Sequence, residues 1–107
     1  MELIKKKCKP CEGNIPPLTE DQANGLLKQI PKWTIKDGHV YRQFKFKDFK
    51  EAIQFVNKVA EIAEQENHHP DITINYNKVS IELYTHAING LSENDFILPA
   101  KIDEIQK

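Results

Sequence analysis

The sequence lacks long hydrophobic runs, and its longest apolar stretch covers only residues 96–100. A membrane-spanning helix needs about 20 consecutive apolar residues, so we exclude an integral membrane protein. The lysines at positions 5–7 are followed by no apolar segment, and the start of the chain therefore does not resemble a secretory signal. We expect a cytoplasmic protein with no membrane partner.

The sequence also has no large excess of charge of either sign, because its 15 Lys and Arg residues nearly balance its 16 Asp and Glu residues. Nucleic-acid binding usually needs a concentrated basic surface, so we expect no direct nucleic-acid partner. None of the 4 glycines belongs to a glycine-rich loop that could hold a dinucleotide. This absence counts against an oxidoreductase.

The chain has 2 cysteines, Cys8 and Cys11, which are spaced as CxxC in a proline-containing segment. A thioredoxin-like site would need a strand-to-helix turn, and a zinc ribbon would need a second cysteine pair. We therefore expect two reduced thiols, with a structural metal as the alternative. Residues 1–17 have no apolar period and predict a flexible arm, followed by a single domain over residues 18–107.

The apolar pattern of this domain predicts the element order α-β-β-α-β-β-α. Thr19 and Gln22 have the spacing of a capping box, which predicts a helix over residues 20–29 that ends before Pro31. The Asp37-Gly38 pair favours a tight hairpin turn within residues 33–46. A helix over residues 48–65 follows from apolar residues spaced by threes and fours.

Phe55 and Ile62 widen the apolar stripe of the second helix. A small domain has little core to cover a second apolar face, so this helix predicts a contact with another subunit. We expect a homodimer or a homotetramer, which Phe55→Glu should dissociate if this helix is the contact.

Alternating residues predict a second hairpin over residues 72–83, with Asn77-Lys78 as its turn. Continuing that register would bring His69 opposite His86. Residues 92–95 predict the start of a last helix, with a kink or a late start near Pro99. The predicted fold is α+β: a four-stranded antiparallel sheet with helices packed on one face.

The predicted hairpin gathers three histidines, His68, His69 and His86, near the end of the sheet. Three imidazoles suit a zinc ion, but neighbouring imidazoles also suit metal-free acid–base catalysis near neutral pH. Glu64 and Asp95 could orient the imidazoles under either interpretation. The spacing alone leaves both interpretations open.

Four short segments follow one another in a specific order: residues 64–71 (EQENHHPD), 76–79 (YNKV), 85–86 (TH) and 90–95 (GLSEND). Together they resemble the pterin-4a-carbinolamine dehydratase family, whose members are also known as dimerisation cofactors of a homeodomain transcription factor. The resemblance covers most of the chain from Leu18 onward. The sequence departs from the family pattern at Ile72, where an aromatic residue is frequent, and at Pro99, where alanine is usual.

The resemblance implies that the protein dehydrates 4a-hydroxytetrahydropterin to quinonoid dihydropterin, in tetrahydrobiopterin recycling. It implies no cofactor and no metal, since the pterin is the substrate. The reaction removes hydroxide from C4a and a proton from N5, so it needs a donor and an acceptor that histidines can supply. The implied catalytic residues are His68, His69 and His86; the implied substrate-binding and orienting residues are Glu64, Pro70, Thr85 and Asp95.

Within this set we assign acid–base duty to His68 and His86, and we assign substrate positioning to His69, with proton transfer left open as a second role. Two alternatives remain at this point. The same resemblance implies a non-enzymatic, coactivator-like module that binds proteins or dimerises, and the three histidines could instead hold zinc.

Overall fold

Two hairpins form a four-stranded antiparallel sheet in the order β1-β2-β4-β3 in the computed structural model, which describes residues 3–8 and 16–106. The strands are β1 (Thr34–Lys36), β2 (His39–Lys45), β3 (Asp71–Asn75) and β4 (Lys78–Leu83). The helices are α1 (Glu20–Leu27), α2 (Phe49–Glu66) and α3 (Asn94–Ile105), with short 3₁₀ turns η1 (Leu3–Lys5) and η2 (His86–Ile88). The predicted α+β architecture and element order are confirmed.

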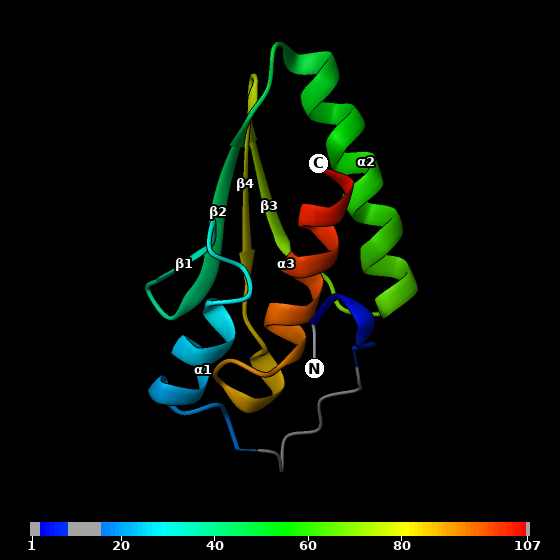
Figure 1. The fold of residues 1–107 in the computed structure, drawn as a ribbon. Helices are drawn as coiled ribbons and strands as arrows, with labels where there is room; N and C mark the ends of the chain where they lie inside the picture. Colours follow the sequence, from blue (N-terminus) through cyan, green and yellow to red (C-terminus); the bar gives the residue numbers. More distant parts are fainter. Residues whose placement is uncertain (1–2, 9–15, 107) are drawn as a thin grey trace.

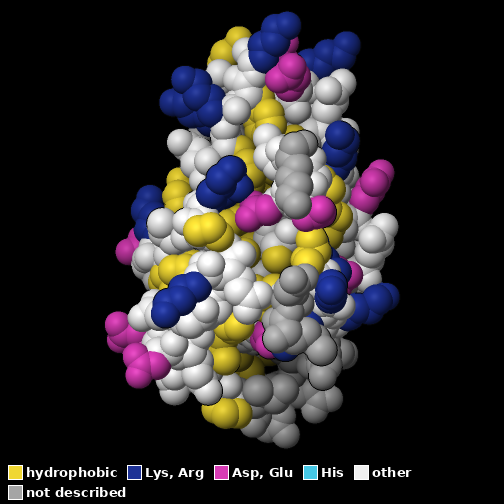
Figure 2. Space-filling model, viewed as in Figure 1, with side chains coloured by type: hydrophobic (Ala, Val, Ile, Leu, Met, Phe, Trp, Pro, Cys, Tyr) yellow, Lys and Arg dark blue, Asp and Glu magenta, His cyan; other side chains and the backbone are white. Residues whose placement is uncertain are grey.

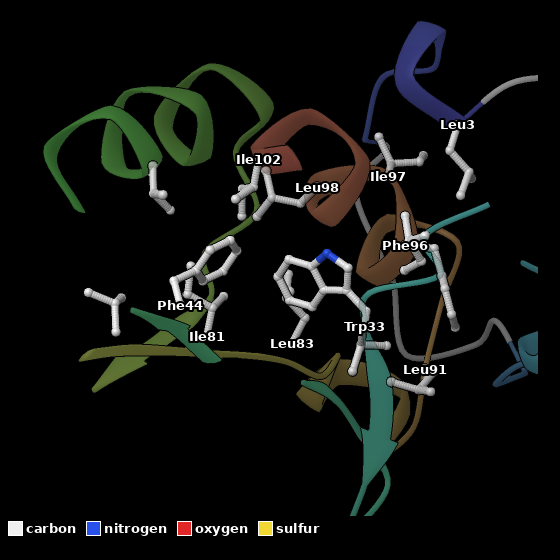
Figure 3. Close-up of a cluster of buried hydrophobic side chains, with 14 of the residues drawn as sticks. Leu3, Trp33, Phe44, Ile81, Leu83, Leu91, Phe96, Ile97, Leu98 and Ile102 are labelled. Carbon is white, nitrogen blue, oxygen red and sulfur yellow. The ribbon is translucent and has the colours of Figure 1, made fainter. Parts of the chain in front are cut away.

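The helices α2 and α3 lie against one face of the sheet, and α1 lies near its β1 end (Figure 1). Between sheet and helices is a core whose largest fully buried side chains include Trp33, Ile81, Leu83, Phe96 and Ile102 (Figure 3). The Trp33 indole N–H donates to the carboxylate of Asp103 in α3. In the described residues, no helix is long and apolar enough to cross a membrane.

Two local predictions are confirmed in detail. The Thr19 hydroxyl accepts the backbone N–H of Gln22, and the Gln22 side chain accepts that of Thr19, which completes the capping box of α1. Asp37 and Gly38 both have positive φ, at 52° and 77°, as a two-residue type I′ turn requires.

The predicted turn of the second hairpin is wrong by one position. Its turn residues are Tyr76 and Asn77, because Asn75 pairs with Lys78 and Ile74 pairs with Val79. Asn77 also exchanges two hydrogen bonds with Phe46: its carbonyl accepts the Phe46 N–H, and its side-chain amide donates to the Phe46 carbonyl. These bonds hold Asn77 beyond the end of the ladder, and the ladder does not pair His69 with His86, which lies in η2.

The last helix begins within residues 92–95, as predicted, because α3 starts at Asn94. It continues through Pro99, so the late start that was the alternative to a kink is wrong. An internal proline removes one hydrogen bond and costs about 3 kcal/mol. Residues on both sides of Pro99 are completely or almost completely buried, so their packing offsets this cost: Phe96, Ile97, Leu98 and Ile102.

The core also extends to Leu3, which the sequence analysis placed in the arm. Leu3 is 2% exposed, and its backbone N–H donates to the side chain of Gln29. The η1 turn that carries Leu3 contacts α3. Residues 3–8 therefore contribute to the packed domain, whereas residues 9–15 of the predicted arm lie outside the described residues.

The subunit contact predicted at Phe55 is wrong as well. Phe55 is 4% exposed and packs against Phe44 and Phe46 of the same chain, with ring centroids 4.6 and 5.0 Å away. The sheet needs this side chain for its own core, so Phe55 is not free to contact another subunit.

We expect Phe55→Ala to lower the free energy of unfolding by about 3–5 kcal/mol, because it leaves a cavity beneath two aromatic rings. Phe49, on the same helix, is 50% exposed, and Phe49→Ala should cost less than about 1 kcal/mol. Urea denaturation followed by circular dichroism measures both variants. Equal losses would contradict this description of the core.

Candidate functional site

The end of α2 orients His68. Asn67 adopts a left-handed conformation with φ of 52°, and its N–H donates to the Glu64 carbonyl. The N–H of His68 donates to the Ala63 carbonyl at 3.2 Å. This is the hydrogen-bond pattern of a Schellman motif, which ends the helix and turns the chain sharply. His68 is thereby directed toward the first turn of α3.

A fully buried carboxylate in that first turn receives the imidazole. Asp95 is 0% exposed, and its Oδ1 lies 2.8 Å from His68 Nε2. Its Oδ2 accepts the Thr85 hydroxyl at 2.7 Å and the Ser92 backbone N–H at 2.9 Å. Burying a carboxylate is costly unless it is hydrogen-bonded, and this one is bonded through both oxygens.

Thr85 connects this carboxylate to His86. Thr85 follows β4 and forms an isolated antiparallel bridge with Gly90, which closes the loop containing η2. His86 is the first residue of η2, and its side chain is exposed. The peptide next to His86 is therefore anchored to the same carboxylate that binds His68.

His69 and Pro70 lie at the margin of this arrangement. His69 Nε2 lies 2.5 Å from Glu64 Oε2, and both side chains are more than half exposed. Pro70 lies in the short link between His69 and β3, and it is partly buried.

The structure thus brings His68, Thr85 and Asp95 into one hydrogen-bonded group and forms a separate His69–Glu64 pair. His86 is hydrogen-bonded to neither of the other histidines in the described residues, and its ring instead contacts Tyr84. Among the same residues, no group of three or more His, Cys, Asp or Glu side chains is arranged to hold a metal ion.

Two residues that contact the site, Ser92 and Tyr84, were not predicted from the sequence as site residues. The Ser92 backbone N–H bonds to Asp95, and its hydroxyl lies 3.0 Å from the Thr85 hydroxyl. The Ser-x-x-Asp spacing is the signature of a capping box, which would have predicted this backbone bond. Tyr84 has no comparable signal, because its contact with His86 depends on the fold of the loop.

Cys8 contacts the last residue of α2 and the first residue of α3, next to the site. Its backbone N–H donates to Glu66 at 2.8 Å, and its thiol contacts the Asn94 carbonyl. Burial, with a smaller contribution from the negative charge of Glu66, raises the pKa of the Cys8 thiol to about 12. Cys8 is therefore a protonated, poorly nucleophilic thiol at neutral pH, and Cys11 lies outside the described residues.

Charged side chains of both signs are interspersed over the helical face (Figure 2). The view shows no continuous basic surface among the described residues, which agrees with the nearly balanced charge of the sequence.

Comparison with known proteins agrees with the sequence resemblance. A family profile described as "Pterin 4 alpha carbinolamine dehydratase" matches residues 16–105. A protein of Nitrosomonas eutropha, provisionally named a pterin-4-alpha-carbinolamine dehydratase, is 50% identical over 95% of this chain and 91% of its own. A Rickettsia bellii protein with the same provisional name is 49% identical over 97% of this chain and 94% of its own.

A solved structure from Brucella melitensis, described as a transcriptional coactivator/pterin dehydratase, has the same fold. Its TM-score is 0.80 at 36% identity, and the match covers 85% of this chain and 99% of that one. The profile and the relatives cover nearly the whole described domain, including every residue of the site. The chain belongs to the pterin-4a-carbinolamine dehydratase family.

Proposed function

We propose that the protein dehydrates 4a-hydroxytetrahydropterin to quinonoid dihydropterin by histidine acid–base catalysis. The observation that carries the proposal is the buried Asp95 carboxylate, which binds His68 and, through Thr85, holds the peptide beside His86. Family membership supplies the substrate class. The reaction breaks the C4a–O and N5–H bonds, forms the C4a=N5 bond and releases water.

The Asp95 contact favours His68 as the base. Asp95 Oδ1 is a natural acceptor for an N–H at His68 Nε2, because Oδ2 already accepts two donors. In a neutral imidazole with a proton on Nε2, Nδ1 carries the lone pair. His68 Nδ1 would then take the proton from N5.

His86 is left as the proton donor to the departing hydroxyl group. Its exposed ring can reach a bound ligand, and its backbone is fixed by the Thr85–Gly90 bridge. His69, paired with Glu64, would orient the pterin, and Pro70 would border the same site. In an organism with an aromatic hydroxylase, this reaction would recycle tetrahydrobiopterin.

We expect His68→Ala and His86→Ala each to lower kcat by about 10²–10⁴, because each removes a proton-transfer group. Asp95→Asn should lose less, since it keeps the imidazole and disturbs only its orientation. The assay follows loss of the ultraviolet absorbance of the substrate, the 4a-carbinolamine, with Gln54→Ala on the exposed side of α2 as the control. If the folded wild-type protein gave no acceleration, the non-enzymatic binding module would be the better interpretation.

We further propose that this chemistry needs no metal. The Nε2 atoms of His68 and His69 face two different carboxylates, Asp95 and Glu64, instead of converging on one point. Dialysis against a strong chelator should leave kcat unchanged. Removal of stoichiometric zinc with loss of activity, and its recovery on adding zinc, would establish a metal-bound hydroxide mechanism instead.

We also propose that the protein forms a homodimer or homotetramer, in which the free edge of β3 meets a second copy. Ile74 on β3 and Tyr76 in the adjoining turn are 37% and 66% exposed, and strand edges with apolar neighbours favour pairing. Sedimentation at micromolar concentration should show a multiple of the 12.4 kDa chain mass. Ile74→Lys should shift the assembly toward the monomer, whereas Ile74→Val should not. A wild-type protein that sediments only as a monomer would exclude the assembly.

A further inference from the structure

Tyr84 lies between two histidines at the end of β4. The last residue pair joining β2 to β4 is Val40 with Leu83, so Tyr84 comes next to His39 just beyond the ladder. The rings of Tyr84 and His39 stack with centroids 4.6 Å apart and an interplanar angle of 20°. This stacking fixes the plane of the tyrosine ring.

The same ring contacts His86. Their centroids are 5.1 Å apart at 73°, which is the edge-to-face geometry that aromatic pairs favour. The Tyr84 hydroxyl donates to Asn89 Oδ1 at 2.5 Å. Tyr84 therefore contacts both the first residue of η2 and the residue that follows this turn.

Asn89 completes the connection. It has a positive φ of 51°, and its backbone N–H donates to the His86 carbonyl at 3.1 Å. The bond from the Tyr84 hydroxyl thus holds Asn89, which closes the η2 turn. The Tyr84 ring at the same time limits the orientations of the His86 imidazole. An exposed histidine without such contacts would populate several rotamers.

We propose that Tyr84 is a positioning residue, which holds the His86 imidazole for proton transfer. This inference rests on the proposed function, because His86 is assigned there as the proton donor. A donor held in one orientation needs less rearrangement to reach the reacting geometry. Tyr84 affects turnover through His86 and touches no reacting atom.

Tyr84→Leu removes both contacts, and we expect it to lower kcat roughly three- to tenfold with little change in KM. Tyr84→Phe keeps the ring and loses only the bond to Asn89, so its loss should be smaller. Asn89→Gly removes the same bond while still allowing the positive φ, and it should cause no additional loss in the Tyr84→Phe background. Tyr41→Leu is the matched control, because Tyr41 is a partly buried tyrosine on the neighbouring strand β2.

A double-mutant cycle with His86→Ala separates positioning from a general structural effect. If Tyr84 acts through His86, Tyr84→Leu should have no further effect on the residual rate of His86→Ala. An equal loss in both backgrounds would overturn the proposal. If Tyr84→Leu does not fold, Tyr84→Phe and Asn89→Gly carry the same cycle.

Nuclear magnetic resonance gives a reading that does not depend on catalysis. The ring protons of His86 should change chemical shift in Tyr84→Leu, because they lose the nearby aromatic ring, and should keep it in Tyr41→Leu. An unchanged His86 signal in Tyr84→Leu would overturn the positioning role. If the wild-type protein lacked dehydratase activity, the proposed function would fail, and this shift would still decide whether the Tyr84 ring contacts His86.

Discussion

The site depends on one buried carboxylate. Asp95 is fully enclosed, yet it accepts two hydrogen bonds at Oδ2 and contacts His68 at Oδ1. An unpaired charge in that position would cost several kcal/mol, so the three groups that bind it must stay in place for the fold to be stable. The hydrogen bonds of Asp95 therefore both stabilise the start of α3 and orient His68.

Three separate parts of the chain meet at this carboxylate, and a local structural feature positions each of them. The left-handed Asn67 turns the chain after α2, the Thr85–Gly90 bridge closes the loop after β4, and the Ser92 N–H bonds back to the first turn of α3. None of these features needs a ligand. The candidate site is thus held in one arrangement by helix ends and a loop closure.

Local chemistry explains what the sequence could predict. The capping box at Thr19 and the Asp37-Gly38 turn depend only on neighbouring residues, and the apolar period of α2 depends only on its own helix. The histidines and Asp95 were assigned to the site from the family resemblance, because their motif order is specific. The structure groups Asp95 with His68, although it does not pair His69 with His86.

The errors came from tertiary contacts that no local pattern contains. The bonds between Asn77 and Phe46 place the second turn one residue earlier than predicted. Phe55, which was predicted to contact another subunit, packs instead against Phe44 and Phe46 of its own chain. Pro99 is accepted inside α3 because the residues around it are buried. In each case the outcome depends on packing or hydrogen bonding with a separate part of the chain.

The most direct test of the account is whether a pterin binds beside His68, which contacts Asp95, and beside His86, which follows the Asp95-bound Thr85. Uniformly labelled protein can be titrated with a stable dihydropterin, the product class, and followed by nuclear magnetic resonance. The account predicts saturable changes in the His68 and His86 ring signals, with no change in the backbone amide signal of Phe49 at the opposite end of α2, and weaker binding in Asp95→Asn. Saturable binding that leaves both histidine signals unchanged would contradict it.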